Sequence, residues 1–551
     1  YNFFAKEKKM KKTYLLILLI VALFLAACSG AEEPVAPESA AEPAAEEEAA
    51  VVEEEAAEEE AADAGPKIFT WAEAIDPFDI DPRTAYDGQG HPVLGQAYET
   101  LTHFNPPGSD TEISPELAVS WESNEDATEW TFVLQEGVVF HDGEPFNAEA
   151  VKALVENVRD GEFATSWVFG SIAEIEVVDD LTIKFTNAYP AKLDLIFTSA
   201  FGAWMVSPNA LDKGGDWFAE GNSAGTGPYK IVSREPGTRI VMERHDEYWG
   251  GWNDKKFDTV VIEYIPDPTV REQMIRAGDI DLTRELDFDN LASLQEAEGV
   301  DVKILPAYNN QFIMLNNARP PLDNVLVRQA LVASYPYEAV IENLIGGHAT
   351  PAGGAIPQTM WGADEGAIVT QDLDKARELL AEAGFADGFE MDYWAYEGDP
   401  TLEQIGEVWI PVLRELNIEL NVTVIDFNAA MEAFWNEPDT AHHAVGLGWF
   451  PTYVTPFDPL FSPFSTGEYF NVAAYDNEDF TNLLFDGDAL TATDQDAAIA
   501  AFQQANQMLI DDGAAIFAFD VPMVWQVRDD IDGFYYSPAY GTVIQAYNLE
   551  R

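Results

Sequence analysis

The residue types that most often carry catalysis or bind metals are few and scattered in this chain. The seven histidines have no regular spacing, and only His442 and His443 are adjacent. Neighbouring residues of a strand point to opposite faces, so this pair is a poor metal site. The patterns GxxxxGK[ST], GxGxxG and HExxH are all missing from the sequence. We therefore expect no catalytic residue, no metal and no cofactor, and the chemistry to look for is that of binding.

The single cysteine, Cys28, stands where covalent lipid attachment would need it. Residues 6–12 contain five lysines and one glutamate. After Thr13, residues 14–27 form a stretch of 14 residues without a charge. This order predicts an export signal, because 14 apolar residues are too few for a transmembrane helix. Residues 25–30 (LAACSG) resemble the bacterial lipobox, in which the cysteine becomes diacylated and forms the mature N-terminus. We predict a signal peptide over 1–27, with Met10 as the suspected translational start.

Two acyl chains on Cys28 would hold the mature protein outside the cytoplasm, at the cell surface or in the periplasm. The alternative is an ordinary cleaved signal peptide with an incidental cysteine. After Cys28 the chain is strongly acidic: residues 29–66 contain 13 Glu, one Asp and no basic residue. Such a sequence cannot bury a core, so we predict that residues 28–66 form a disordered tether.

The composition of the whole chain restricts the partners further. The 98 acidic residues outnumber the 29 basic ones and give a formal net charge of -69, which repels phosphate backbones and excludes nucleic acid as a partner. A hydrophobic fraction of 47% provides enough material for globular cores. One cysteine cannot form an intrachain disulfide or a cysteine-rich metal centre.

The elements after the tether alternate between strands and helices. Residues 130–134 and 181–185 alternate in hydrophobicity with a period of two, which predicts half-buried strands. Asp372 and Gly384 enclose a predicted helix, since these residue types commonly cap helix ends. A strand at 389–393, a helix near 404–416 and a strand at 419–425 form a βαβ unit, which implies parallel pairing. The predicted fold class is α/β, in two or three lobes.

Several segments resemble the extracytoplasmic solute-binding proteins of family 5, the peptide-, opine- and nickel-binding components of ABC importers. The matching segments are Ser114–Trp121, Trp130–Asn147, Gly225–Tyr229, Asp246–Gly250, Arg328–Leu331 and Lys375–Gly384. The resemblance implies a periplasmic-binding-protein-like fold, with two α/β lobes around a ligand cleft and an inserted extra domain. It assigns 67–112, 218–312 and 526–551 to the first lobe, 113–217 to the extra domain and 313–525 to the second lobe. It also implies a monomer that does no catalysis and delivers a small-molecule solute to a transmembrane permease.

Residues 448–456 (GWFPTYVTP) resemble a loop of the family's peptide binders, whose first aspartate pairs with the ligand's ammonium group. Here Thr452 and Thr455 replace both aspartates. A buried ammonium group without a countercharge is costly, so the change disfavours free-amine peptides unless Asp458 or another nearby acid takes over. The ends of strands in open α/β sheets commonly bind ligands, which adds aromatic residues of the βαβ unit. The candidate ligand-binding residues are Trp449, Phe450, Thr452, Tyr453, Trp394, Tyr396, Asn309 and Gln311.

Two solute classes fit these candidates. A peptide or peptide-like solute follows from the resemblance, and an oligosaccharide suits aromatic planes with neutral hydrogen-bonding groups. Outside the receptor interpretation, an extracellular hydrolase and an adhesin or chaperone lipoprotein remain as alternatives.

Replacing Cys28 by serine removes the sulfur that lipid attachment needs. We expect Cys28→Ser to move the mature protein from membranes to the soluble fraction and to leave solute binding unchanged. Cell fractionation after a high-salt wash measures this, and a variant that stays in the membrane fraction would contradict the lipoprotein interpretation.

Overall fold

Two long antiparallel strands, β12 (Val300–Leu315) and β17 (Ala515–Arg528), organise the fold. The computed structural model describes residues 65–86, 88–397 and 399–551, so the predicted signal peptide, Cys28 and nearly all of the predicted tether lie outside the described residues. Both strands are rich in the β-branched and aromatic residues that favour strands. Their register shifts between Leu305 and Asn309, where Pro306 and Pro522 stand opposite in the two strands and cannot donate to the ladder.

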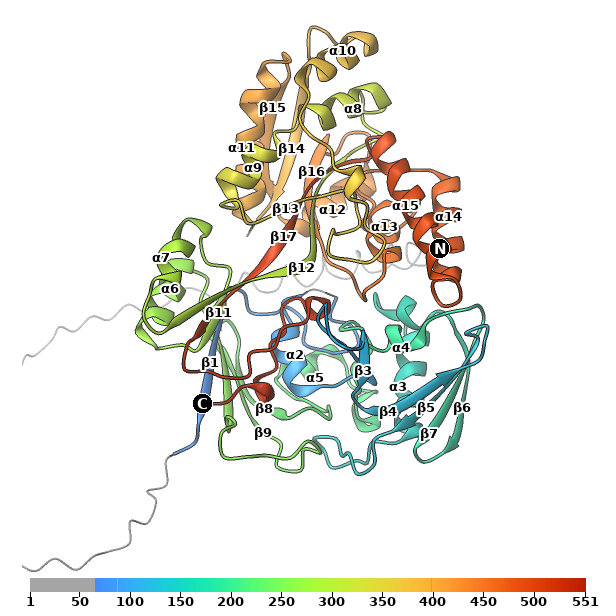
Figure 1. The fold of residues 1–551 in the computed structure, drawn as a ribbon, viewed down its shortest axis with the longest axis vertical. Helices are drawn as coiled ribbons and strands as arrows, with labels where there is room; N and C mark the ends of the chain where they lie inside the picture. The colour runs from blue at the N-terminus through green and yellow to red at the C-terminus, as the bar shows by residue number, and fades with distance from the viewer. Residues whose placement is uncertain (1–64, 87, 398) are drawn as a thin grey trace, which may run out of the picture. The chain divides into compact units, whose positions relative to one another are not determined.

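The two strands lie in the middle of an eleven-stranded sheet (Figure 1). Its order is β15 (Glu419–Ile425), β14 (Glu390–Tyr396), β16 (Ala444–Trp449), β12, β17, β11 (Leu282–Arg284), β1 (Ile68–Glu73), β10 (Thr259–Tyr264), β9 (Arg239–Arg244) and β8 (Tyr229–Glu235), with β13 (Thr350–Pro351) paired to β17. β12 and β17 thus join one group of strands, β14 to β16, to another, β8 to β11 and β1. In the part of the chain that the structure describes, these are the strands shared by both groups.

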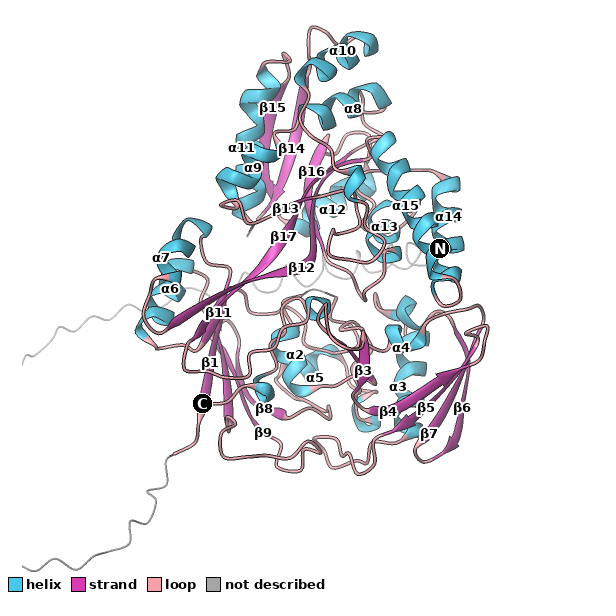
Figure 2. Cartoon of the chain, viewed as in Figure 1, coloured by secondary structure: helices cyan, strands magenta, loops and turns pink. Residues whose placement is uncertain are grey.

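The chain between β3 and β8 forms a separate four-stranded sheet (Figure 2). Its order is β4 (Ala118–Ser123), β5 (Glu129–Leu134), β7 (Thr182–Asn187) and β6 (Ile172–Asp179), all antiparallel. A short pair, β2 (Thr102–Phe104) and β3 (Ile113–Pro115), lies beside it in the sequence.

Helices cover both faces of the β14–β16–β12–β17 part of the sheet. Side chains of α8 to α11 pack with Ile313, Leu315 and Phe519 on one face, and those of α13 to α15 pack with Phe312, Met314 and Phe517 on the other. The α-helices are α2 (His91–Ala97), α3 (Ala148–Asp160), α4 (Leu193–Ile196), α5 (Gly215–Ala219), α6 (Pro268–Ala277), α7 (Leu291–Gln295), α8 (Val325–Ser334), α9 (Tyr337–Leu344), α10 (Leu373–Ala383), α11 (Pro400–Arg414), α12 (Phe427–Asn436), α13 (Phe457–Phe464), α14 (Glu478–Thr491) and α15 (Gln495–Asp511). Among the described residues, no helix is both long and apolar enough to cross a bilayer.

The predicted α/β class is confirmed, and so is the βαβ unit. β14 and β15 pair in parallel along their whole length, with α11 between them in the sequence. The Asp372 side chain accepts a hydrogen bond from the Lys375 N–H, and Gly384 ends α10 with a φ of 86°. One detail was wrong: His442 and His443 precede β16 and do not belong to a strand. The lobe boundaries stay a prediction.

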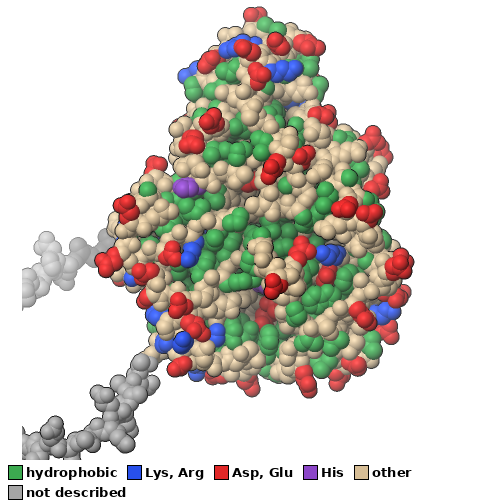
Figure 3. Space-filling view, in the orientation of Figure 1, with side chains coloured by type: hydrophobic (Ala, Val, Ile, Leu, Met, Phe, Trp, Pro, Cys, Tyr) green, Lys and Arg blue, Asp and Glu red, His purple; other side chains and the backbone are tan. Residues whose placement is uncertain are grey.

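The acidic side chains are spread over the face of the molecule drawn in Figure 3 and do not gather in one patch. A charge spread in this way keeps a protein soluble and does not mark one binding site.

Two glycines of β16 allow a test of packing within one strand. A Cβ atom on Gly446 would lie 2.5 Å from Leu402 Cδ2 and 2.8 Å from Tyr393 Oη, whereas one on Gly448 would have its nearest contact, Gln311 Oε1, at 3.8 Å. We expect Gly446→Ala to lower the free energy of unfolding by about 1–3 kcal/mol, because overpacking a core costs that much. Gly448→Ala, measured by the same urea titration, should cost much less, and equal losses would contradict this packing.

Candidate functional site

The candidate site is centred on the loop that follows β16. The strand ends at Trp449, and Pro451 and Pro456 prevent the strand from continuing before α13 begins at Phe457. Thr452, in the middle of this loop, is only 3% exposed. Its backbone N–H donates to Asp458 Oδ2 at 2.7 Å, which ties the loop to the first turn of α13.

Asp458 is fully buried behind Thr452. Its carboxylate accepts hydrogen bonds from the Thr452 N–H, from Ser462 Oγ at 3.2 Å and from Trp449 Nε1 at 3.4 Å. Burial raises the pKa of Asp458 to about 6, and the hydrogen bonds oppose that rise. Donors from Trp449, Thr452 and Ser462 therefore occupy this carboxylate, and the Thr452 hydroxyl also lies 3.5 Å from Asp458 Oδ1.

Residues from distant parts of the chain meet Thr452 on its other side. Tyr86 Oη lies 3.0 Å from Thr452 Oγ1, and Ser199 Oγ donates to the Thr452 carbonyl at 2.9 Å. Trp167 Nε1 donates to Tyr86 Oη at 3.3 Å, which fixes the phenol. Tyr86 belongs to the predicted first lobe, and Trp167 and Ser199 belong to the predicted extra domain.

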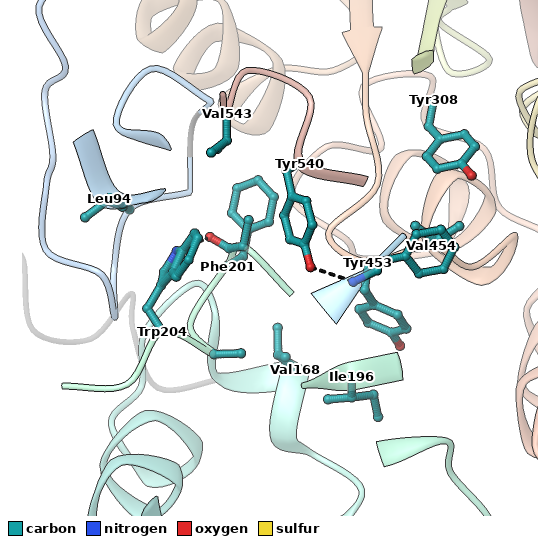
Figure 4. Close-up of a cluster of buried hydrophobic side chains, with 14 of the residues drawn as sticks. Leu94, Val168, Ile196, Phe201, Trp204, Tyr308, Tyr453, Val454, Tyr540 and Val543 are labelled. Carbon is teal, nitrogen blue, oxygen red and sulfur yellow. Dashed lines mark hydrogen bonds between the residues drawn. The ribbon is translucent and has the colours of Figure 1, made fainter. Parts of the chain in front are cut away.

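Aromatic rings surround this contact. The Trp449 and Phe470 ring centroids are 5.1 Å apart, Trp167 and Tyr453 are 5.8 Å apart, and Phe201 lies 5.8 Å from Phe450. Figure 4 shows Tyr453 and Val454 beside Val168 and Ile196, with Phe201, Trp204 and Tyr540 nearby. Trp449, Phe450, Thr452 and Tyr453 are thus brought together as predicted, but their role in binding a ligand stays a prediction.

The remaining candidate residues lie in two strands of the large sheet, β14 and β12. Trp394 and Tyr396, in β14, make their ring contacts with His442 and Phe427. Asn309 and Gln311 pair with Val521 and Phe519 of β17. Gln311 also lies opposite Gly448, so it is on the sheet face that does not carry Trp449. Their role in ligand binding stays a prediction as well.

A pocket of about 370 Å³, open solvent included, lies beside this cluster. Its lining residues are Thr100, His103, Glu116, Trp204, Tyr535, Ser537, Tyr540, Val543 and Gln545, of which Trp204, Tyr540 and Val543 appear in Figure 4. Burial and the neighbouring Glu99 raise the pKa of Glu116 to about 8. The pocket therefore combines aromatic walls with one titratable acid.

Sequence reasoning missed the residues that face Thr452. Tyr86, Trp167, Ser199 and Phe201 lie in loops or a short 3-10 turn, where no periodic pattern marks a functional position. Only their contacts with the loop after β16 distinguish them from other buried aromatic and hydroxyl side chains.

Comparison with known proteins shows which family this chain belongs to. The family model described as bacterial extracellular solute-binding proteins, family 5 Middle, matches residues 112–471. The chain belongs to this family. A probable D,D-dipeptide-binding periplasmic protein of Escherichia coli (strain K12) is 27% identical over 490 residues, which cover 87% of this chain and 93% of the relative.

Two further family 5 relatives agree with this assignment. A glutathione-binding protein of Pectobacterium atrosepticum is 28% identical over 468 residues, covering 83% of this chain and 90% of that protein. The crystal structure of a dipeptide-binding protein from Pseudoalteromonas sp. SM9913 in complex with Met-Leu superposes with a TM-score of 0.76 at 22% identity, covering 88% of this chain and 100% of that one. The periplasmic-binding-protein fold predicted for this family 5 chain is therefore confirmed.

The hydrogen bond between Tyr86 and Thr452 holds two segments of this family 5 protein together. We expect Tyr86→Phe to strengthen the affinity for a solute that enters between them by about two- to tenfold, because the solute no longer displaces a neutral hydrogen bond worth about 0.5–1.5 kcal/mol. Isothermal titration calorimetry measures the affinity, and small-angle X-ray scattering should show a larger ligand-free particle.

Tyr229→Phe is the matched control. Tyr229 is fully buried and Tyr86 partly so, but the Tyr229 hydroxyl donates to the Phe257 carbonyl at 2.9 Å, away from Thr452. Its loss should reduce stability and leave affinity unchanged. Equal affinities of the two variants would show that the Tyr86 contact does not contribute to closure.

Proposed function

We propose that this protein is the solute-binding receptor of an ABC importer and delivers a peptide or peptide-like solute to the transmembrane permease. It acts as a monomer without catalysis, and the lipid on Cys28 anchors it outside the cytoplasm. The names of the relatives support the solute class, since they are described as dipeptide- and glutathione-binding proteins. Family membership supports the receptor role.

The observation that carries the proposal is the contact at Thr452. Tyr86 and Ser199 stand on one side of this contact and Thr452 on the other, and their segments are joined through β12 and β17. Both of these strands contain a proline where their register shifts. A ladder weakened at one point permits hinge motion, and hinge closure around a ligand is how binding proteins of two lobes capture solute. Opening at this hinge would separate Tyr86 and Ser199 from Thr452 and admit the solute between them.

An oligosaccharide is the second candidate, and one observation favours it. The loop presents the hydroxyl of Thr452 among Trp449, Phe450 and Tyr453, and the nearest acid of the loop, Asp458, is already occupied by its own donors. Stacked rings with neutral hydrogen-bonding groups suit the CH faces and hydroxyls of sugars.

A panel of dipeptides to pentapeptides and neutral oligosaccharides separates the candidates. At about 100 times its Kd, a true solute should stabilise the folded protein by about 2.7 kcal/mol, seen as a rise in Tm, and mass spectrometry should recover it unmodified. Recovery of a cleaved solute would favour a hydrolase. No rise with any member of the panel would contradict the receptor proposal and favour an adhesin or chaperone.

A further inference from the structure

A row of residues connects the candidate site to the middle of the sheet. Asn310 of β12 lies directly opposite Trp449 of β16 on one side and Asp520 of β17 on the other, and Asp520 in turn faces Thr350 of β13. Directly opposite residues of neighbouring strands point to the same face, with Cβ atoms about 5 Å apart. Asp520 therefore shares the face of Trp449, two strands away from it.

Several buried polar atoms of this row and of the neighbouring Gln358 lack hydrogen-bond partners. Asp520 is 4% exposed and Asn310 is 1% exposed. Asp520 Oδ2 accepts from the Gln358 N–H at 2.6 Å, and Asn310 Nδ2 donates to the Gly354 carbonyl at 3.0 Å. Asp520 Oδ1, Asn310 Oδ1 and both amide atoms of the Gln358 side chain have no hydrogen-bond partner among the described residues. A buried unpaired polar atom costs about 1–3 kcal/mol, so the cluster of Asp520, Asn310 and Gln358 would be stabilised by a donor-rich partner.

The chain segment beside this cluster is held in place by its own contacts and is linked to the Thr452 loop. A Cβ atom on Gly353 would lie 2.4 Å from Gln358 Nε2, so glycine lets this segment approach the Gln358 amide closely. Asn506 Nδ2 donates to the Gly353 carbonyl at 2.7 Å and holds the segment in place. Farther along the same segment, Trp361 Nε1 donates to the Val454 carbonyl at 3.1 Å, two residues after Thr452.

We propose that the cluster of Asp520, Asn310 and Gln358 binds a primary ammonium group of the transported solute. The inference rests on the proposed receptor function. An ammonium group carries one positive charge and three donors, and the cluster offers one carboxylate oxygen and two amide oxygens without donors. Asp520 thereby supplies the countercharge that the Thr452 loop does not, since Thr452, Ser462 and Trp449 already donate to Asp458.

Proton release should accompany this binding. Burial raises the pKa of Asp520 to about 8, and the Gln358 N–H opposes the rise. The groups that face Asp520 from β12, β13 and the Gly353 segment are Asn310, Thr350 and Gln358, none of which is charged. An ammonium group needs the ionised carboxylate, so affinity should increase by up to tenfold per pH unit between about pH 5.5 and 7, where the free protein holds Asp520 protonated.

Calorimetry on the mature protein tests the proposal with two matched pairs of probes. One pair is Ala-Phe and N-acetyl-Ala-Phe, and the other is butylammonium chloride and butanol. For wild type we expect each amine to bind at least tenfold more tightly than its neutral partner. Asp520→Asn should remove this preference and the pH dependence, and Gln358→Leu should weaken amine binding by several-fold while it keeps the backbone donor to Asp520.

Two further variants act as controls. Asp301→Asn makes the same chemical change on β12 at a half-exposed position, where the carboxylate pairs with Lys303 at 2.5 Å, and it should leave the preference intact. Glu116→Gln tests the acid that lines the pocket beside Trp204 and Tyr540.

Three results would overturn the inference: an amine preference that survives in Asp520→Asn, one that is lost in Glu116→Gln instead, or no binding of either amine by wild type. Binding of oligosaccharides alone would also overturn it, yet it would leave the receptor function standing.

Discussion

The pairing of β12 with β17 is the constraint on which the rest of the structure depends. Both groups of strands in the large sheet are built outward from these two strands, so every contact at Thr452 presupposes their register. Pro306 and Pro522 interrupt the ladder between Leu305 and Asn309, and the register shifts again between Gln311 and Phe312. The result is a continuous sheet with a compliant stretch between its two groups of strands, which allows motion without loss of the two cores.

Local pattern was sufficient to predict most elements of the fold. The period of two at 130–134 and 181–185, and the capping residues around 373–383, lie within elements that the structure confirms, because these signals depend on neighbours in the sequence. The motif of residues 448–456 likewise pointed to the Thr452 loop. Long-range pairing was beyond such reasoning: nothing near Tyr86 or Ser199 in the sequence indicates that they meet Thr452.

Asp520 illustrates the same limit. It stands in an apolar run, FAFDVPMV, where a single acid gives no indication of its partners. Among 98 acidic residues it could not be singled out from the sequence. Only the cross-strand register shows that it faces Asn310 and shares a face with Trp449. The sequence was therefore enough to predict the part of the site that lies in one continuous segment. It was not enough to predict the residues that neighbouring strands bring together.

The contact between Tyr86, Ser199 and Thr452 has a consequence for selectivity. These groups satisfy one another when no solute is present, so the protein contains its own competitor for the cleft. A molecule that enters gains only the difference between its interactions and those it displaces. Compounds that match the cleft in part gain little from this exchange and dissociate quickly. Such internal competition filters out loosely fitting metabolites before they reach the membrane.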